Sequence, residues 1–187
     1  QAALLTFKAS AGQTPGRMNL FNLGKYHALV DYAHNPHSYE ALAGFVRNWP
    51  GERVGVIGGP GDRRDEDFVL LGNLSAGMFD RIIVKEDDDG RGRPRGEAAR
   101  FIAKGLQETK PDCHFETILD ETTAIETALD KAPANGLVVI LPESVSRAIQ
   151  LIEKRRPIKD ADAIAPLRPN PEPPPQTTLN EDSGVPA

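Results

Sequence analysis

Five consecutive aliphatic residues occupy positions 137–141, Leu137-Val138-Val139-Ile140-Leu141, and this run decides the fold. A continuous apolar run of that length is typical of a strand buried on both faces of a parallel sheet. Arg81-Ile82-Ile83-Val84 has the same character, and residues 53–57 form a short run rich in valine and isoleucine. Segments with helical spacing separate these runs. Strand alternating with helix predicts a mostly parallel sheet covered by helices on both faces.

The same criteria extend outward to the rest of the chain. A β-hairpin is expected over residues 17–31 with Leu23-Gly24 at its turn, and one more strand over residues 114–119. The helices are expected over residues 36–48, 65–79, 97–108, 121–131 and 145–155. We therefore predict an α/β fold, a Rossmann-like, mostly parallel sheet with flanking helices and an N-terminal β-hairpin.

The composition limits the classes of partner. The chain is 39% hydrophobic and 26% charged, as in ordinary soluble globular proteins, and its formal net charge is -5. This negative charge argues against nucleic acid or an anionic membrane as the partner, and it suits a cationic small substrate. The single cysteine, Cys113, excludes an internal disulfide and fits a cytoplasmic location. No stretch of sequence is long and apolar enough to span a membrane.

Three segments are expected along the chain. The sequence begins with Gln1 and shows no signal-peptide pattern, so we expect a cut inside a longer polypeptide, with residues 1–14 as a connector from an upstream domain. Residues 15–156 are expected to form the folded domain. Residues 157–187 hold half of the chain's 16 prolines and little aliphatic clustering, which predicts a disordered tail.

Polar residues cluster where the predicted strands end, and ligands of open parallel sheets bind there. The hairpin is followed by Asp31-Tyr32-Ala33-His34-Asn35-Pro36. Asp31 can accept from ribose hydroxyls, while His34 and Asn35 can donate to phosphate oxygens at a helix amino end that Pro36 opens. Taken alone, the pattern also fits a polar turn that only caps a helix.

Glycines dominate the next loop, Gly58-Gly59-Pro60-Gly61-Asp62-Arg63-Arg64. Glycine lets the backbone approach a ligand and point N–H groups at an anion, and Asp62 and Arg63 add a charge of each sign. The loop is not a Walker A motif, because no Gly-Lys-Ser/Thr follows. A tight surface connection is the alternative explanation.

The most charged loop is Lys85-Glu86-Asp87-Asp88-Asp89-Gly90-Arg91-Gly92-Arg93-Pro94-Arg95. Four consecutive acids repel one another and would weaken the fold without a cationic partner. Carboxylates hold a guanidinium through two parallel hydrogen bonds, and a nearby arginine could hold the carboxylate of the same substrate. The loop therefore indicates either a guanidinium site or a solvated acidic surface.

A fourth junction between strand and helix reads Leu141-Pro142-Glu143-Ser144-Val145-Ser146-Arg147. Glu143 is a candidate ligand-binding residue, but Glu143 or Ser144 can equally cap the helix that follows. The 4 histidines lack the acidic or cysteine spacing of a zinc site, so no metal site built by this chain is predicted. Spacing alone assigns no catalytic residue.

The order and separation of these loops resemble the carboxy-terminal domain of Mur ligases. The motifs themselves are most similar to those of the cyanophycin synthetase branch. The motifs that show this similarity are G-R-M-N-L-F, V-D-Y-A-H-N-P, G-G-P-G-D-R-R-D-E-D-F, I-I-V-K-E-D-D-D, R-G-R-P-R-G and L-P-E-S-V-S-R. The resemblance covers about residues 15–155. Murein-type enzymes carry a lysine-glycine-histidine motif near residues 141–147, and its absence here argues against a muramyl substrate.

This resemblance implies an amide ligase that uses ATP and Mg²⁺. Such an enzyme would activate the β-carboxylate of aspartate in a poly-aspartate backbone as an acyl phosphate, which the α-amine of L-arginine would then attack. The resemblance also implies an aspartate-terminated primer, a homo-oligomer, a central domain that binds most of the ATP and Mg²⁺, and an aspartate-adding ATP-grasp module. Neither module is present in these 187 residues, so we expect the chain alone to be inactive.

The resemblance also implies roles for individual residues. The nucleotide-side residues are Arg17, Asp31, His34 and Asn35. The arginine-binding residues are Asp62, Arg63, Asp87, Asp88, Arg91 and Glu143. Two other functions stay open, a murein-type or folylpolyglutamate-type ligase that adds another amino acid, and a non-catalytic nucleotide-binding or assembly module. An enzyme that adds glutamate should need positive charge in the loop that is acidic here.

Overall fold

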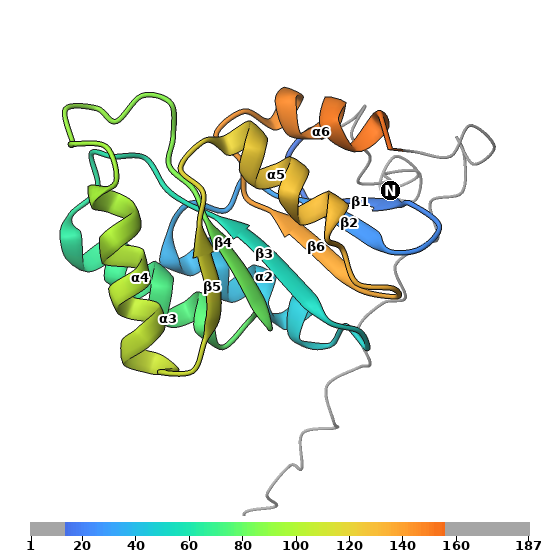
Figure 1. The fold of residues 1–187 in the computed structure, drawn as a ribbon, viewed down its shortest axis with the longest axis horizontal. Coiled ribbons are helices and arrows are strands. Elements are labelled where there is room, and N and C mark those ends of the chain that lie inside the picture. The colour runs from blue at the N-terminus through green and yellow to red at the C-terminus, as the bar shows by residue number, and fades with distance from the viewer. Residues whose placement is uncertain (1–13, 156–187) are drawn as a thin grey trace, which may run out of the picture.

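Helices cover both faces of a six-stranded sheet in the computed structural model, which describes residues 14–155 (Figure 1). The strands are β1 (Asn19–Asn22), β2 (His27–Val30), β3 (Arg53–Ile57), β4 (Arg81–Val84), β5 (His114–Thr117) and β6 (Leu137–Ile140). Their order across the sheet is β1-β2-β6-β3-β4-β5. The expected connector lies outside the described residues except for Thr14, and the expected proline-rich tail lies wholly outside them.

The sheet is parallel except at its amino-terminal edge. β1 pairs antiparallel with β2, as the predicted hairpin requires, while β2, β6, β3, β4 and β5 all run parallel. β6 lies between β2 and β3, and all four of its residues are buried. The decisive aliphatic run is therefore a central strand, and the predicted fold is confirmed.

Two hydrophobic cores explain why this strand is apolar at every position. Leu137 and Val139 belong to one core, and Val138 and Ile140 to the other, because successive side chains of a strand point to opposite faces. The first core is covered by α2 (Pro36–Arg47), α3 (Asp65–Ala76) and α4 (Glu97–Thr109). The second is covered by α5 (Glu121–Asp130) and α6 (Val145–Glu153) (Figure 1).

Two glycines let α3 and α4 lie side by side. A Cβ on Gly72 would overlap the carbonyl oxygen of Ile102, and one on Gly105 would overlap that of Val69. This close packing fixes the start of α4, and so the loop that leads into it, against the loop that leads into α3.

Element boundaries agree with the sequence to within a few residues, and the largest difference has a packing cause. α3 ends at Ala76 rather than near Phe79. The chain leaves the helix so that the ring of Phe79 can cover β3 at Gly55, where a Cβ would lie 2.6 Å from the ring. Phe79 itself is only 2% exposed, so the core sets the end of this helix.

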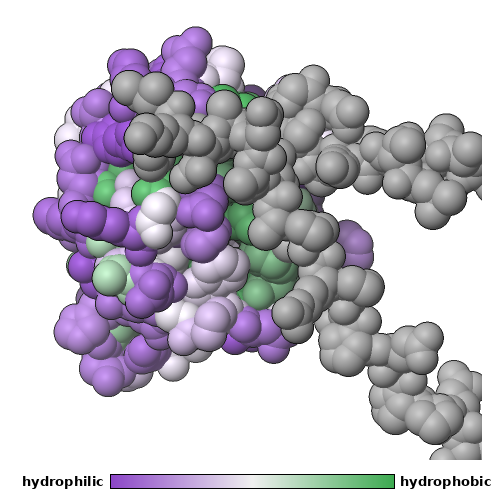
Figure 2. All heavy atoms as spheres, turned by 90° about the vertical axis from the view of Figure 1, so that its right-hand side faces the viewer, coloured by the Kyte–Doolittle hydropathy of each residue, from purple (hydrophilic) through white to green (hydrophobic). Residues whose placement is uncertain are grey.

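The face on the right-hand side of Figure 1 is drawn in Figure 2. Its described part is largely hydrophilic, with hydrophobic residues gathered beside the atoms drawn in grey. Over residues 14–155, no helix combines the length and the apolar character needed to cross a membrane.

Candidate functional site at the carboxyl ends of the strands

Four loops meet at the end of the sheet where the parallel strands finish, at the upper left of Figure 1. They follow β2, β3, β4 and β6. A narrow cleft that we call the four-loop cleft lies between them and is lined by Tyr32, Ala33, His34, Gly58, Gly59, Pro60, Lys85, Asp87, Arg91, Leu141, Pro142 and Glu143. The predicted gathering of strand-end turns is therefore present in the fold.

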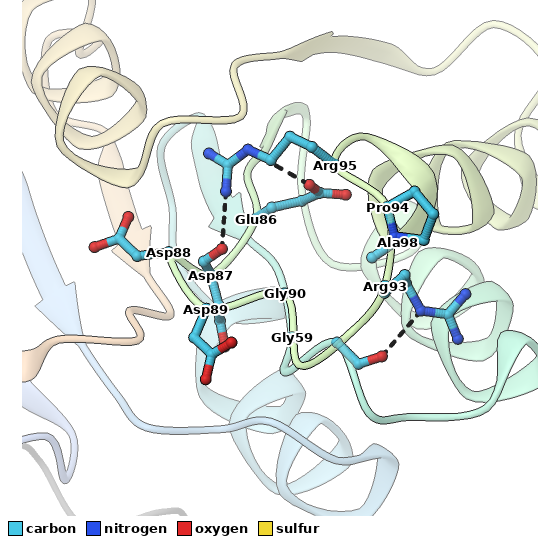
Figure 3. Close-up of a pocket in the computed structure, with 11 residues that line it drawn as sticks. Gly59, Glu86, Asp87, Asp88, Asp89, Gly90, Arg93, Pro94, Arg95 and Ala98 are labelled. Carbon is cyan, nitrogen blue, oxygen red and sulfur yellow. Dashed lines mark hydrogen bonds and ion pairs between the residues drawn. The ribbon is translucent and has the colours of Figure 1, made fainter.

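A second hollow, which we call the acidic cleft, lies beside it and has a volume of about 210 Å³. It is lined by Gly59, Gly61, Glu86, Asp87, Asp88, Asp89, Gly90, Arg93, Pro94, Arg95 and Ala98. Figure 3 shows the aspartates on one side of it and Arg93 with Ala98 on the other. Asp87 and Gly59 line both clefts, so the two hollows adjoin at these residues.

Glu86 has a structural partner at the start of α4. Its carboxylate accepts hydrogen bonds from the backbone N–H of Gly96 at 2.8 Å and of Ala99 at 3.0 Å. Gly96 is the N-cap and has no side chain of its own to satisfy these donors. An anion is favoured at a helix start, so Glu86 caps α4 and holds the acidic loop against it.

Arg93 joins the acidic loop to the glycine-rich loop. Its guanidinium donates to the carbonyl oxygens of Gly61 at 2.9 Å and Arg63 at 2.8 Å, and it pairs with Asp65 at 2.8 Å. It also lies 5.1 Å from the centre of the Phe68 ring. These contacts make Arg93 a clamp between two loops.

Packing accounts for two of the three glycines in the loop after β3. A Cβ on Gly61 would overlap the carbonyl oxygen of Gly90, and one on Gly58 would lie 2.9 Å from Cε of Lys85. Gly58 therefore gives the Lys85 side chain room to pass, and Gly61 lets the two loops touch. Neither glycine needs a ligand to explain it.

A group of charges centred on the buried side chains of Lys85, Asp87 and Glu121 lies where these loops meet, and we call it the charge hub. The ammonium of Lys85 lies 2.7 Å from Asp87 Oδ1 and 2.8 Å from Glu121 Oε2. Glu121, the first residue of α5, is 0% exposed. Arg147, from α6, pairs with Asp88 at 2.6 Å and with Glu121 at 3.4 Å. Glu143 completes the hub, because its Oε2 accepts from the backbone N–H of Asp88 at 2.8 Å.

Asp62 and Arg91 form an exposed ion pair at the rim. Arg91 Nη1 lies 2.8 Å from Asp62 Oδ2, and this hydrogen bond lowers the pKa of the Asp62 carboxyl. The backbone of Arg91 is in the left-handed region, with φ of 47°. Asp62, Arg63 and Arg91 line a further shallow hollow with Arg93 and others. The predicted arginine-binding residues thus border neighbouring hollows rather than one cavity.

The predicted nucleotide-side residues lie at the same end of the sheet but have local partners. Asp31 Oδ2 accepts from the backbone N–H of Met18 at 2.9 Å, and burial raises the pKa of the Asp31 carboxyl. Asn35 is the N-cap of α2, and its side chain accepts from Ser38 N at 3.0 Å. Arg17 is exposed beside Asp31. Of these four residues, only His34 lines the four-loop cleft.

The sequence also matches the model of a known protein family. Residues 16–144 match the model of the family described as Mur ligase, glutamate ligase domain. The chain belongs to this family. The match spans the sheet, its loops and the charge hub up to Ser144, which confirms the resemblance inferred from the sequence motifs.

Relatives of this Mur ligase domain point to one branch. The chain is 70% identical to cyanophycin synthetase of Nostoc sp. (strain PCC 7120 / SAG 25.82 / UTEX 2576) over 161 residues, 86% of this chain but 18% of that protein. It is 33% identical to UDP-N-acetylmuramyl-tripeptide synthetase of Borreliella burgdorferi over 67% of this chain and 25% of that protein. The chain thus spans less than a fifth of the length of the cyanophycin synthetases that it matches.

Solved structures share the fold of the domain. A UDP-N-acetylmuramoyl-L-alanyl-D-glutamate–2,6-diaminopimelate ligase superposes with a TM-score of 0.64 at 19% identity, covering 76% of this chain and 32% of that one. E. coli FolC in complex with ADP superposes with a TM-score of 0.60 at 21% identity, covering 82% and 38%. These likenesses confirm the Rossmann-like architecture of the Mur ligase domain.

Within residues 14–155, one group of acids has metal-like spacing, and a lysine already occupies it. Ligand atoms of Asp87, Glu121 and Glu143 lie within 4.8 Å of one another. Lys85 supplies the positive charge there, and Glu121 accepts two backbone N–H groups besides. The trio therefore does not fit Mg²⁺, and we assign it no metal.

Sequence analysis missed three residues of the site. Lys85 was quoted in the acidic loop without a role, Glu121 was placed only at a helix start, and Arg147 only near a possible cap. A lysine directly after a buried strand and before four acids was the available signal for Lys85. Nothing in the local sequence links Lys85 to Glu121, which opens α5, the second helix after β4.

Proposed function

We propose that the chain is the arginine-adding lobe of a ligase of the cyanophycin synthetase type. In this proposal, an ATP- and Mg²⁺-dependent enzyme activates the β-carboxylate of an aspartate in a poly-aspartate primer as an acyl phosphate. The α-amine of L-arginine then attacks and releases phosphate, and an amide bond forms. The upstream domains of the same polypeptide would hold most of the ATP and Mg²⁺, in a cytoplasmic homo-oligomer.

The observation that carries the proposal is the acidic cleft. Three consecutive aspartates, Asp87, Asp88 and Asp89, line it beside Glu86, and a guanidinium is the ligand that carboxylates bind with two parallel hydrogen bonds. The ion pairs of Asp87 and Asp88 use one oxygen of each carboxylate. The second oxygen of each remains able to accept from a substrate guanidinium, and Arg63 or Arg91 at the rim can pair with the substrate carboxylate.

On the nucleotide side, Tyr32 and His34 line the four-loop cleft together. His34 Nδ1 lies 3.0 Å from the carbonyl oxygen of Tyr32, and the two rings lie 5.1 Å apart at the four-loop cleft. The half-exposed Tyr32 ring can therefore contact a base. Asp31 precedes Tyr32 in the same loop with Arg17 beside it, where ribose hydroxyls would bind in this proposal.

A chimeric ligase tests the proposal. We would replace the matching part of the Nostoc cyanophycin synthetase with this chain and measure phosphate release with ATP, primer and arginine. Asp88→Lys should raise KM for arginine at least tenfold and leave KM for ATP within twofold, because Asp88 lies on the acidic side of the site. The charge reversal Glu108→Lys, at the exposed end of α4, is the matched control and should change neither KM.

Two results would count against the proposal. An unchanged KM for arginine in Asp88→Lys would remove the acidic cleft as its binding site. Product formed by the 187-residue chain alone would overturn the assignment of catalysis to a larger ligase.

A murein-type ligase is the second candidate, because the chain is 33% identical to a muramyl-tripeptide synthetase. Its acidic loop disfavours an anionic amino acid. Supplying the chimera with each amino acid in turn separates the two functions: use of arginine alone supports the first, and use of glutamate or diaminopimelate supports the second. A non-catalytic nucleotide-binding or assembly module would support neither reaction.

A further inference from the structure

Glu121 stands out in the charge hub because it is the least exposed of the acids there and is far in sequence from the loops it contacts. Its side chain is 0% exposed. A carboxylate that far from water is unfavourable unless several donors satisfy it. Its location beneath the site, and not in either cleft, means that it does not meet the ligand directly.

Four donors satisfy this carboxylate. Oε2 accepts from Lys85 Nζ at 2.8 Å and from the backbone N–H of Glu143 at 2.6 Å. Oε1 accepts from the backbone N–H of Ser144 at 3.2 Å and from Arg147 Nη1 at 3.4 Å. Glu121 therefore ties the ends of β4 and β6 and the start of α6 to the start of α5.

The same donors hold the acids that face the clefts. Lys85 also binds Asp87 at 2.7 Å, and Arg147 also binds Asp88 at 2.6 Å. Glu121 thus shares both cations with the aspartates. Without it, Lys85 would be the counter-ion of Asp87 alone, and its positive charge would fully balance the negative charge of the Asp87 carboxylate.

The charged groups of the hub do not balance one another. Lys85 and Arg147 are its cations, and its acids are Asp87, Asp88, Glu121 and Glu143. Four carboxylates against two cations leave a surplus of two negative charges. Charges in a partly buried site are screened less than charges on the surface, so this surplus favours a cationic ligand.

We propose that Glu121 is a positioning residue that balances part of the charge of Lys85 and so leaves net negative charge at Asp87 towards a cationic ligand. The inference rests on the proposed function. It adds that selection of arginine over a neutral isostere depends on a residue that arginine never touches. L-citrulline is such an isostere, because its urea group replaces the guanidinium without its charge.

The test compares kcat/KM for arginine and for citrulline in the chimeric ligase, and takes their ratio as the preference. Glu121→Gln should lower this preference at least fivefold, because Lys85 is then paired only with Asp87. The double variant Glu121→Gln/Lys85→Met should return the preference to within threefold of the native value, because both charges of the pair are gone. Glu126→Gln, in the same helix but outside the hub, should leave it within twofold.

The rescue separates positioning by charge from a purely structural role. If Glu121 only supported the fold, the double variant would be no better than the single one, and that result would overturn the inference. A preference kept within fivefold in Glu121→Gln would overturn it as well. If the chimera with the native domain does not prefer arginine, the proposed function fails first, and the inference fails with it.

A third variant covers the case in which Glu121→Gln does not fold. Lys85→Met leaves Asp87 and Glu121 without their shared cation, so the surplus negative charge of the hub grows. The preference for arginine should then rise above the native value. An unchanged or lower preference in folded Lys85→Met would contradict the proposed offset.

Discussion

The two sides of the site are held in different ways. On the nucleotide side, Asp31 and Asn35 accept from backbone N–H groups, and the bond of Asn35 lies within its own turn of chain. On the acidic side, Asp87 shares Lys85 with Glu121, and Asp88 pairs with Arg147, 59 residues further along the chain. The nucleotide side therefore depends on hydrogen bonds to the backbone, and the acidic side depends on ion pairs between distant parts of the chain. Changes of charge should affect the acidic side far more.

The largest effect on stability is expected for Lys85→Met. Removal of this ammonium leaves two buried carboxylates without their shared cation, which costs about 3 kcal/mol or more in the free energy of unfolding. Urea denaturation of the 187-residue chain measures it. Lys104→Met removes an exposed pair with Glu108, at 3.7 Å, and should cost about 0.5 kcal/mol or less. Equal costs for the two variants would show that the hub is no more than a surface pair.

Arg93→Met should have the next largest effect. The change removes hydrogen bonds to Gly61 and Arg63 and the ion pair with Asp65, at a cost of about 2 kcal/mol. Because Arg93 clamps the glycine-rich loop, amide hydrogens of residues 58–64 should exchange faster than in the native chain. Hydrogen exchange measures this, with the more exposed Arg100→Met as control. Unchanged exchange in the loop would refute the role of clamp.

The smallest effect is expected for Asp31→Asn, on the nucleotide side, and it should depend on pH. Burial raises the pKa of this carboxyl above 3.8, so the folded state favours the protonated form. The stability contributed by Asp31 is then complete below the ordinary pKa and is lost as pH rises through the raised value. Asp31→Asn should therefore compare more favourably with the native chain at pH 7 than at pH 3. Urea unfolding at both values tests this against Asp112→Asn, an exposed control, and a difference that does not change with pH would contradict it.

Sequence patterns were sufficient for the fold and insufficient for the partners within the site. The run at 137–141 implied a central strand because a short run rich in valine and isoleucine and apolar at every position is typical of a strand buried on both faces. Parallel topology then placed the loops after β2, β3, β4 and β6 together. The partner of Lys85 could not be predicted in this way. Glu121 follows Asp120 at the start of a helix, where an acidic residue is common without any further partner.

The predicted roles of the glycine-rich loop illustrate the same limit. Glycine at 58 and 61 was interpreted as access for an anion, yet the neighbours that require it are Lys85 and Gly90. A loop that must pass another backbone and a loop that must admit a phosphate use the same residue. Only the tertiary neighbours tell them apart.

The helix starts around the site have a consequence for phosphate. Asn35 caps α2, Glu86 caps α4, Asp120 caps α5, and Ser144 with Glu121 closes α6. The remaining helix, α3, opens with Asp65, Glu66 and Asp67. Among residues 14–155, an incoming polyanion therefore meets helix starts whose N–H groups or dipoles are already satisfied or balanced by the protein's own groups. Its negative charge must be balanced by arginines at the rim or by cations that arrive with it, so nucleotide affinity in this lobe should fall steeply with ionic strength.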